Sequence, residues 1–181
     1  MRVLVTGSAG HLGEGLVRVL RERKHEVIAL DRLASPFTTS VGSVSDRDFI
    51  RSCVRGVDRI IHTATLHKPH LATHSRQAFI ETNVTGTLVI LEAARECGVS
   101  GVVFSSTTSA FGGALRPADG QPAAWVDEHI ESVPKNIYGG TKRAAEDLCQ
   151  MFFRSHGLPS IVLRTARFFP EEDDDPELRP Q

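Results

Sequence analysis

A tyrosine and a lysine four positions apart are the residues of this sequence best suited to proton transfer. Tyr138, the only tyrosine of the chain, and Lys142 stand in the stretch NIYGGTK. Residues four apart lie on one face of a helix, so both side chains can point into one cleft. A free phenol has a pKa of about 10, but a neighbouring ammonium group stabilises the phenolate and lowers that pKa. The pair can therefore exchange a proton with an alcohol or a ketone.

A hydroxyl group is also needed to orient the oxygen of such a substrate. The stretch VVFSSTTSAFGG, residues 102–113, begins as a buried strand and ends in a cluster of serines and threonines. The tyrosine and lysine spacing recurs by chance in many helices, so a polar pair on a helix surface is the alternative interpretation. The hydroxyl cluster favours a catalytic set.

Glycines after the first apolar run predict a site for a dinucleotide. The stretch TGSAGHLG, residues 6–13, joins the expected strand 2–6 to the expected helix 11–23. A tight turn there lets backbone N–H groups approach a pyrophosphate, which the start of the helix also attracts. The residues predicted to contact the cofactor in this turn are Gly7, Gly10, His11, Leu12 and Gly13. A glycine turn without a ligand is the structural alternative.

Asp31 follows the second expected strand, eighteen positions beyond Gly13. At this spacing a carboxylate binds the hydroxyl groups of the adenosine ribose and repels the 2′-phosphate of NADP. The predicted cofactor is therefore NAD. Arg32 beside it could hold that phosphate, so NADP stays an alternative.

Short β-branched runs that alternate with helical patterns position these residues. We expect strands at 2–6, 26–30, 38–41, 59–62, 102–106 and 160–164, and helices at 11–23, 45–56, 73–97 and 138–156. This alternation predicts an α/β fold with a doubly wound parallel sheet and helices on both faces. Residues 112–134 are rich in glycine and proline and predict a loop at the strand ends, where such sheets bind ligands.

Charge and composition exclude several other classes of protein. The formal net charge of −1 provides no large basic field, so a nucleic-acid partner is not expected. The apolar runs are too short to span a membrane or to act as a signal peptide, which predicts a cytoplasmic protein. The separated cysteines, Cys53, Cys97 and Cys149, fit neither a disulfide framework nor a zinc site. The histidines in HTATLHKPHLATH straddle a proline without a local carboxylate, so we expect a polar cleft rim and no metal.

Taken in order, the motifs TGSAGHLG, Asp31, IIHTA, Asn83, FSSTTSAFG and YGGTK resemble those of the extended short-chain dehydrogenase/reductase family, which includes nucleotide-sugar 4-epimerases and dehydratases. The resemblance covers nearly the whole chain. It implies a Rossmann-type fold with a tightly bound nicotinamide cofactor and a catalytic set of serine or threonine, tyrosine and lysine.

The resemblance also implies a role for each matching residue. Thr107 is the expected catalytic hydroxyl, with Ser106 and Thr108 as alternatives, and Tyr138 is the acid and base. Lys142 is expected to hold the nicotinamide ribose and to lower the pKa of Tyr138. The remaining assignments are Asn83 to a structural and relay position, Thr63, Ala64 and Thr65 to the lining of the cofactor site, and Ser43 and Val44 to the neighbourhood of the adenine.

The match departs from the family in length and at local positions. Family members are usually much longer, so we expect residues 1–170 to form the NAD-binding domain and residues 171–181 to be an acidic stub, with the C-terminal substrate lobe largely absent. Dehydratases carry an Asp-Glu pair where this chain has Thr108 and Ser109, which disfavours dehydration. Arg167 stands where sugar-nucleotide enzymes often have asparagine.

The predicted function is that of an NAD-dependent epimerase or dehydrogenase with reversible hydride transfer at a secondary alcohol, in a substrate such as a nucleotide sugar. One alternative is an NAD(P)-dependent oxidoreductase acting on a non-sugar alcohol or ketone. Another is a non-catalytic NAD(P)-binding sensor or scaffold. The long helix and the Tyr138 helix carry apolar positions that predict either a homodimer contact or ordinary core packing.

Overall fold

Six parallel strands form a single sheet in this computed structural model, which describes residues 1–127 and 129–166. The strands are β1 (Arg2–Thr6), β2 (Glu26–Asp31), β3 (Ser40–Val41), β4 (Arg59–His62), β5 (Val102–Thr107) and β6 (Ser160–Thr165). Their order is β3-β2-β1-β4-β5-β6, so the chain builds outward from β1 in one direction and then returns to its other side. The predicted doubly wound sheet is confirmed. Such a reversal opens a crevice at the carboxyl ends of β1 and β4.

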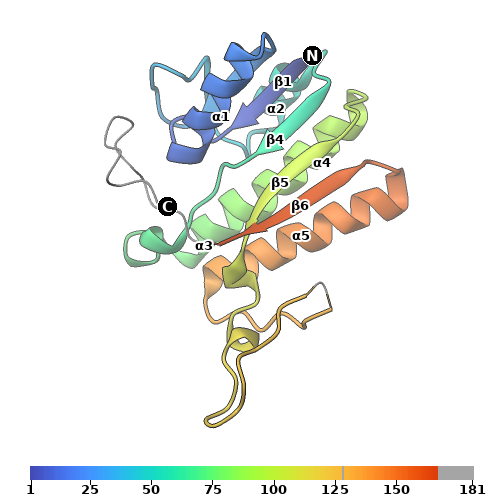
Figure 1. The fold of residues 1–181 in the computed structure, drawn as a ribbon. Helices are drawn as coiled ribbons and strands as arrows, with labels where there is room; N and C mark the ends of the chain where they lie inside the picture. Colours follow the sequence, from blue (N-terminus) through green and yellow to red (C-terminus); the bar gives the residue numbers. More distant parts are fainter. Residues whose placement is uncertain (128, 167–181) are drawn as a thin grey trace.

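Helices cover both faces of this sheet (Figure 1). Helix α1 (His11–Glu22) packs on one face, with Val3 and Val5 of β1 and Val17 in a small apolar cluster. Helices α2 (Arg47–Val54), α4 (Gly86–Glu96) and α5 (Ile137–His156) pack on the other face. Leu4 points to that second face because successive side chains of a strand alternate. Alternate side chains of β1 therefore pack into two separate cores, one on each face of the sheet.

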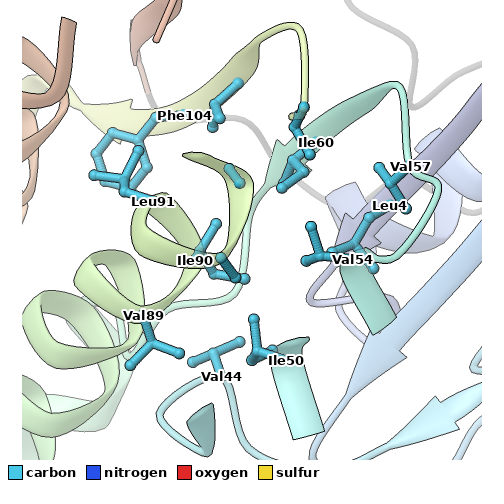
Figure 2. Packing of buried hydrophobic residues seen from close by; sticks show 14 of the residues in the cluster. Leu4, Val44, Ile50, Val54, Val57, Ile60, Val89, Ile90, Leu91 and Phe104 are labelled. Carbon is cyan, nitrogen blue, oxygen red and sulfur yellow. The ribbon is translucent and has the colours of Figure 1, made fainter. Parts of the chain in front are cut away.

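The larger core lies between the sheet and α2, α4 and α5. Figure 2 shows Leu4 and Ile60 from the sheet packed towards Ile50 and Val54 of α2 and Ile90 of α4. All five side chains are fully buried. This packing fixes the helices against the strands whose ends carry the candidate site.

The long helix predicted at residues 73–97 is wrong in its start and in its geometry. It begins at Arg76 because the Ser75 side chain caps it, accepting a hydrogen bond from the Ala78 N–H at 3.1 Å. Helix α3 (Arg76–Phe79) continues into a π-helical segment, η2 (Ile80–Thr85), and then into α4. Residues 68–72 form a separate 3-10 turn, η1 (Lys68–Ala72). A π turn changes the direction of the side chains within it, which decides where Asn83 points.

The glycine- and proline-rich loop is anchored where β5 ends. After two 3-10 turns, η3 (Thr108–Ala110) and η4 (Gly113–Leu115), the chain protrudes from the sheet as a loop (Figure 1). It returns beside Gly112, which forms an isolated bridge with Val133. The Gly113 N–H donates to the Val133 carbonyl at 2.7 Å, and the Val133 N–H donates to the Phe111 carbonyl at 3.0 Å. The loop therefore delivers the chain directly to the start of α5. Within the described residues, no helix has the length and apolar character needed to cross a membrane.

Truncation of a core side chain tests this packing. We expect Ile90→Ala to lower the free energy of unfolding by about 2–5 kcal/mol, because a fully buried side chain leaves a cavity. Val19→Ala on the exposed side of α1, where Val19 is 46% exposed, is the matched control and should change stability by less than about 0.5 kcal/mol. Urea unfolding measures both. Equal losses would contradict the assigned core.

Candidate active site

A crevice of about 1690 Å³ opens at the carboxyl ends of the strands. It exceeds the range of about 300–1,000 Å³ usual for small-molecule sites, so it has room for a large ligand. The predicted site residues that line it are Gly7, Gly10, His11, Leu12, Gly13, Asp31, Arg32, Ser43, Val44, Thr63, Ala64, Thr65, Thr107, Tyr138 and Lys142. Asn83 lies behind this lining. The structure thus brings together residues that are far apart in the sequence.

The glycine turn is shaped by close contacts between backbone atoms. Gly7 has φ of +81°, and its N–H donates to the Leu30 carbonyl at 2.7 Å. A Cβ atom on Gly13 would lie 1.9 Å from the Gly7 carbonyl oxygen, so only glycine lets α1 start this close to β1. Gly10 occupies the N-cap position, and no side chain caps the helix there. The positive end of α1 lines the crevice, where the sequence predicts an anion.

Asp31 joins the end of β2 to this turn. Its Oδ2 accepts from the Ala9 N–H and its Oδ1 from the Leu33 N–H, both at 3.0 Å. A carboxylate has about four acceptor positions, so two hydrogen bonds leave capacity for ribose hydroxyls. Arg32 lines the same crevice. The geometry fits the predicted adenosine end of a dinucleotide site.

Tyr138 lies in the first turn of α5 and meets Thr107 from the end of β5. Helix α5 starts here because Asn136 caps it, its Oδ1 accepting from the Gly139 N–H at 3.0 Å. The Tyr138 side chain is buried, which raises the pKa of the phenol, and a hydrogen bond with the Thr107 hydroxyl acts in the opposite direction. The phenol is therefore protonated at neutral pH. Ser106 points elsewhere, since its hydroxyl donates to Glu146.

Lys142 is buried one turn along the same helix. Its Nζ donates to the Ser105 carbonyl at 2.5 Å and lies 4.1 Å from the centre of the Phe104 ring. Burial lowers the pKa of Lys142 to about 7, although Glu146 and Cys149 act to raise it. The predicted lowering of the pKa of Tyr138 by Lys142 is not found here, because the ammonium group is turned towards the strand. Burial also raises the pKa of the Cys149 thiol to about 12.

Asn83 uses its whole side chain to hold the site in place. Its Oδ1 accepts from the Leu66 N–H at 2.8 Å and from Thr65 Oγ1 at 3.0 Å. Its Nδ2 donates to the Leu66 carbonyl at 2.9 Å and to Thr141 Oγ1 at 3.0 Å. Thr141 Oγ1 in turn donates to the Tyr138 carbonyl at 3.0 Å. Asn83 therefore clamps the loop after β4 against α5, which fits the structural part of its predicted role.

His62 is a positioning residue that the sequence reasoning missed. Thr87 Oγ1 donates to the Asn83 carbonyl at 2.7 Å, so its oxygen accepts from His62 Nε2 at 3.1 Å. His62 Nδ1 then accepts from Thr6 Oγ1 at 2.7 Å, and burial together with Lys142 lowers the pKa of His62 to about 3. Thr6 Oγ1 also accepts from the Thr63 N–H at 3.2 Å. In the sequence, the position of His62 at the end of the apolar run IIHTA indicated that it would be buried. The run did not indicate that Thr6 and Thr87 would be its hydrogen-bond partners.

The other histidines of the stretch HTATLHKPHLATH, which are His67, His70 and His74, line the rim of the crevice. The His67 N–H donates to His70 Nδ1 at 3.0 Å, and the His67 ring accepts from the His70 N–H in a reciprocal capping box. The rings of His70 and His74 meet edge to face, 5.0 Å apart. Within residues 1–127 and 129–166, no group of three or more histidine, cysteine, aspartate and glutamate residues is arranged to hold a metal ion.

Comparison with known proteins gives this crevice a context. Residues 3–179 match the model of the NAD dependent epimerase/dehydratase family. The chain is 30% identical over 171 residues to the UDP-glucose 4-epimerase of Streptomyces lividans, covering 88% of this chain and 50% of that protein. It is 29% identical to the uronate dehydrogenase of Pseudomonas syringae pv. tomato, covering 94% of this chain and 60% of that one.

A solved structure has the same fold. A short-chain dehydrogenase/reductase superfamily protein from Agrobacterium tumefaciens with bound NAD superposes with a TM-score of 0.79 and is 30% identical, covering 91% of this chain and 48% of that one. The chain spans about half the length of the curated relatives it matches.

His62 makes stability depend on pH in a predictable direction. The unfolded chain binds a proton on His62 near the ordinary pKa of 6.5, whereas the folded chain resists until about pH 3. The contribution of neutral His62 to the free energy of unfolding is therefore fully present above pH 6.5. It falls by about 2 kcal/mol between pH 7 and pH 5. We expect His62→Gln to be less stable at pH 7 and to show a correspondingly smaller loss in urea unfolding. Parallel curves for the two proteins would contradict this assignment.

A pair of glycine substitutions in α1 tests the turn. Gly13→Ala should cost about 1–3 kcal/mol of stability, because backbone atoms must move, and should weaken binding of NAD. Gly15→Ala meets no atom within 4 Å and should stabilise the helix by up to about 1 kcal/mol while leaving NAD binding unchanged. Isothermal titration with NAD and thermal unfolding measure the two effects. The prediction fails if both variants lose affinity equally.

Proposed function

Because the chain belongs to the NAD-dependent epimerase/dehydratase family, we propose that it is the nucleotide-binding part of an enzyme that moves hydride between a secondary alcohol carbon and NAD. The observation that carries this proposal is the meeting of Thr107 and Tyr138 in the crevice that the glycine turn also lines. Lys142 lies in the same lining. A dinucleotide-binding fold and a proton-transfer group therefore share one cavity.

The described residues fit NAD along its length. The N-terminal end of α1, with its positive dipole, would hold the pyrophosphate, and the remaining acceptor positions of Asp31 would bind the adenosine ribose. Ser43 and Val44 would lie beside the adenine. When bound, NAD supplies the acceptor and donor of hydride. Asp31 favours NAD over NADP, since its carboxylate repels a 2′-phosphate.

The chain's own residues would handle the proton. Tyr138, protonated at neutral pH, would donate its proton to a carbonyl oxygen in the reducing direction. In the oxidising direction its phenolate form would accept the hydroxyl proton. Thr107 would hold the same oxygen. Lys142 would hold the nicotinamide ribose and, by turning from the Ser105 carbonyl towards the phenol, favour the phenolate. An epimerase would return hydride to the other face of the carbonyl carbon, whereas a dehydrogenase would release the ketone.

We propose that the substrate is a nucleotide sugar and that the reacting group is a secondary hydroxyl of its sugar. Support comes from relatives named as a UDP-glucose epimerase and a uronate dehydrogenase. Thr108 and Ser109 line the crevice where a dehydratase would carry acids, so the proposal does not extend to dehydration. Arg167 lies outside the described residues. A homodimer through α4 and α5 stays a prediction, as does the domain limit at residue 170.

A non-catalytic NAD-binding module is the second candidate. The observation that favours it is the direction of the Lys142 ammonium group, which donates to the Ser105 carbonyl and is turned away from Tyr138. Binding of NAD without hydride transfer to it from any alcohol tested would support this second function.

Substitution of the phenol tests the catalytic proposal. We expect Tyr138→Phe to slow reduction of NAD by UDP-glucose about 10²–10⁴-fold in single-turnover absorbance measurements at 340 nm, because it removes the group that transfers the proton. NAD affinity, measured by isothermal titration, should change little. Ser109→Ala, on the same rim of the crevice, is the control and should retain the rate. Equal rates for the wild type and Tyr138→Phe would refute the role of Tyr138.

A further inference from the structure

A buried carboxylate lies one helical turn beyond Lys142. Glu146 is 3% exposed and belongs to the face of α5 that packs against the sheet. Arg164 of β6 donates to both of its oxygens, from Nε at 3.0 Å and from Nη2 at 2.6 Å. The Ser106 hydroxyl of β5 donates to it as well. One carboxylate thus joins α5 to the ends of two strands.

Stability alone does not explain a charge in this place. Removing two ions from water is costly, and a buried ion pair is often no more stabilising than apolar side chains of the same size. An apolar pair would also fill the space between α5 and β6. The position of Glu146 beside Lys142 gives its charge a different use.

Several groups around Lys142 set its electrostatic environment. On α5 these are Tyr138, Glu146 and Cys149, and on β4 it is His62. From β5 the Ser105 carbonyl receives the ammonium group and the Phe104 ring lies beneath it. From β6, Arg164 adds a positive charge next to Glu146.

The balance among these groups depends on Glu146. Burial lowers the pKa of Lys142, and the charge of Glu146 is the largest influence in the described residues that raises it. Without that charge, the pKa of Lys142 would be lower still, and a larger share of the lysine would be neutral at physiological pH.

We propose that Glu146 is a positioning residue for Lys142: its contacts with Ser106 and Arg164 hold α5 where the ammonium group reaches the Ser105 carbonyl of β5, and its buried charge, one helical turn away, favours the protonated form of that group. Arg164 tunes this effect, since it neutralises part of the charge of Glu146. The importance of the coupling for hydride transfer rests on the function proposed above, whereas the coupling itself does not.

Removing the negative charge of Glu146 and, separately, the positive charge of Arg164 distinguishes this proposal from a purely structural role. The chain has four lysines, of which Lys24, Lys68 and Lys135 are exposed, so ¹³C-labelled lysine gives four signals with one buried group to titrate by NMR. Lys142 should titrate near pH 7 in the wild type. Glu146→Gln should move the midpoint down by about one pH unit and Arg164→Gln should move it up. Both substitutions break the same ion pair, and Arg164→Gln should destabilise the fold more, because it leaves the buried carboxylate unpaired.

A conservative substitution and a measurement of NAD binding complete the test. Glu146→Asp keeps the charge and should restore most of the wild-type midpoint. NAD affinity should fall above the pH at which Lys142 loses its proton. In Glu146→Gln this pH should be lower by the same interval as the lysine midpoint, so a shift of one pH unit means a tenfold loss of NAD affinity at alkaline pH. Shifts in the same direction for Glu146→Gln and Arg164→Gln, or no shift in either, would overturn the proposal. If Glu146→Gln does not fold, the direction of the shift in Arg164→Gln decides alone.

The lysine titration needs neither cofactor nor substrate. Failure of hydride transfer with the expected lysine shifts would therefore refute the proposed function and leave the charge coupling standing. Hydride transfer that depends on Tyr138, with no shift of the lysine midpoint, would support the proposed function and refute the charge coupling.

Discussion

The crevice depends on a neutral histidine held between two threonine hydroxyls. His62 joins the end of β1 through Thr6 to α4 through Thr87, at the point where the strand order reverses. Parallel strands end in loops that have no ladder of their own, so some other set of hydrogen bonds must fix them. Because Thr6 also receives N–H groups from the loop after β4, a single imidazole orients both walls of the cofactor site. Thr87 passes the same constraint to Asn83 and thus to the loop beside α5.

Burial acts in opposite directions on the two groups that handle charge in this site. It raises the pKa of Tyr138 and lowers that of Lys142, so both side chains are pushed towards their neutral forms. Thr107 opposes this effect on the phenol, and Glu146 opposes it on the lysine. The site therefore contains two polar partners, Thr107 and Glu146, that favour the charged forms which the apolar surroundings disfavour.

Local patterns made much of this arrangement predictable. The strand and helix alternation, the glycine turn with Asp31 and the spacing of Tyr138 and Lys142 all depend on neighbours within one or two elements. The π segment was not predictable, because the apolar positions of residues 76–96 fit an ordinary helix equally well. Glu146 and Arg164 were missed for another reason. They meet only once β5, β6 and α5 are packed, and neither residue type indicates burial by itself.

The central position of β1 also makes assembly slow. Val3 pairs with Arg59, so the middle of the sheet closes only after a long loop has been brought together. Until β4 arrives, one edge of this short apolar strand is unpaired and can recruit another chain. Tyr138 and Lys142 are contributed by a helix that packs later in chain order, between the last two strands. Because its walls come from β1 and from α5, the crevice exists only in a molecule that has finished folding, and a bound dinucleotide would protect the finished chain from unfolding.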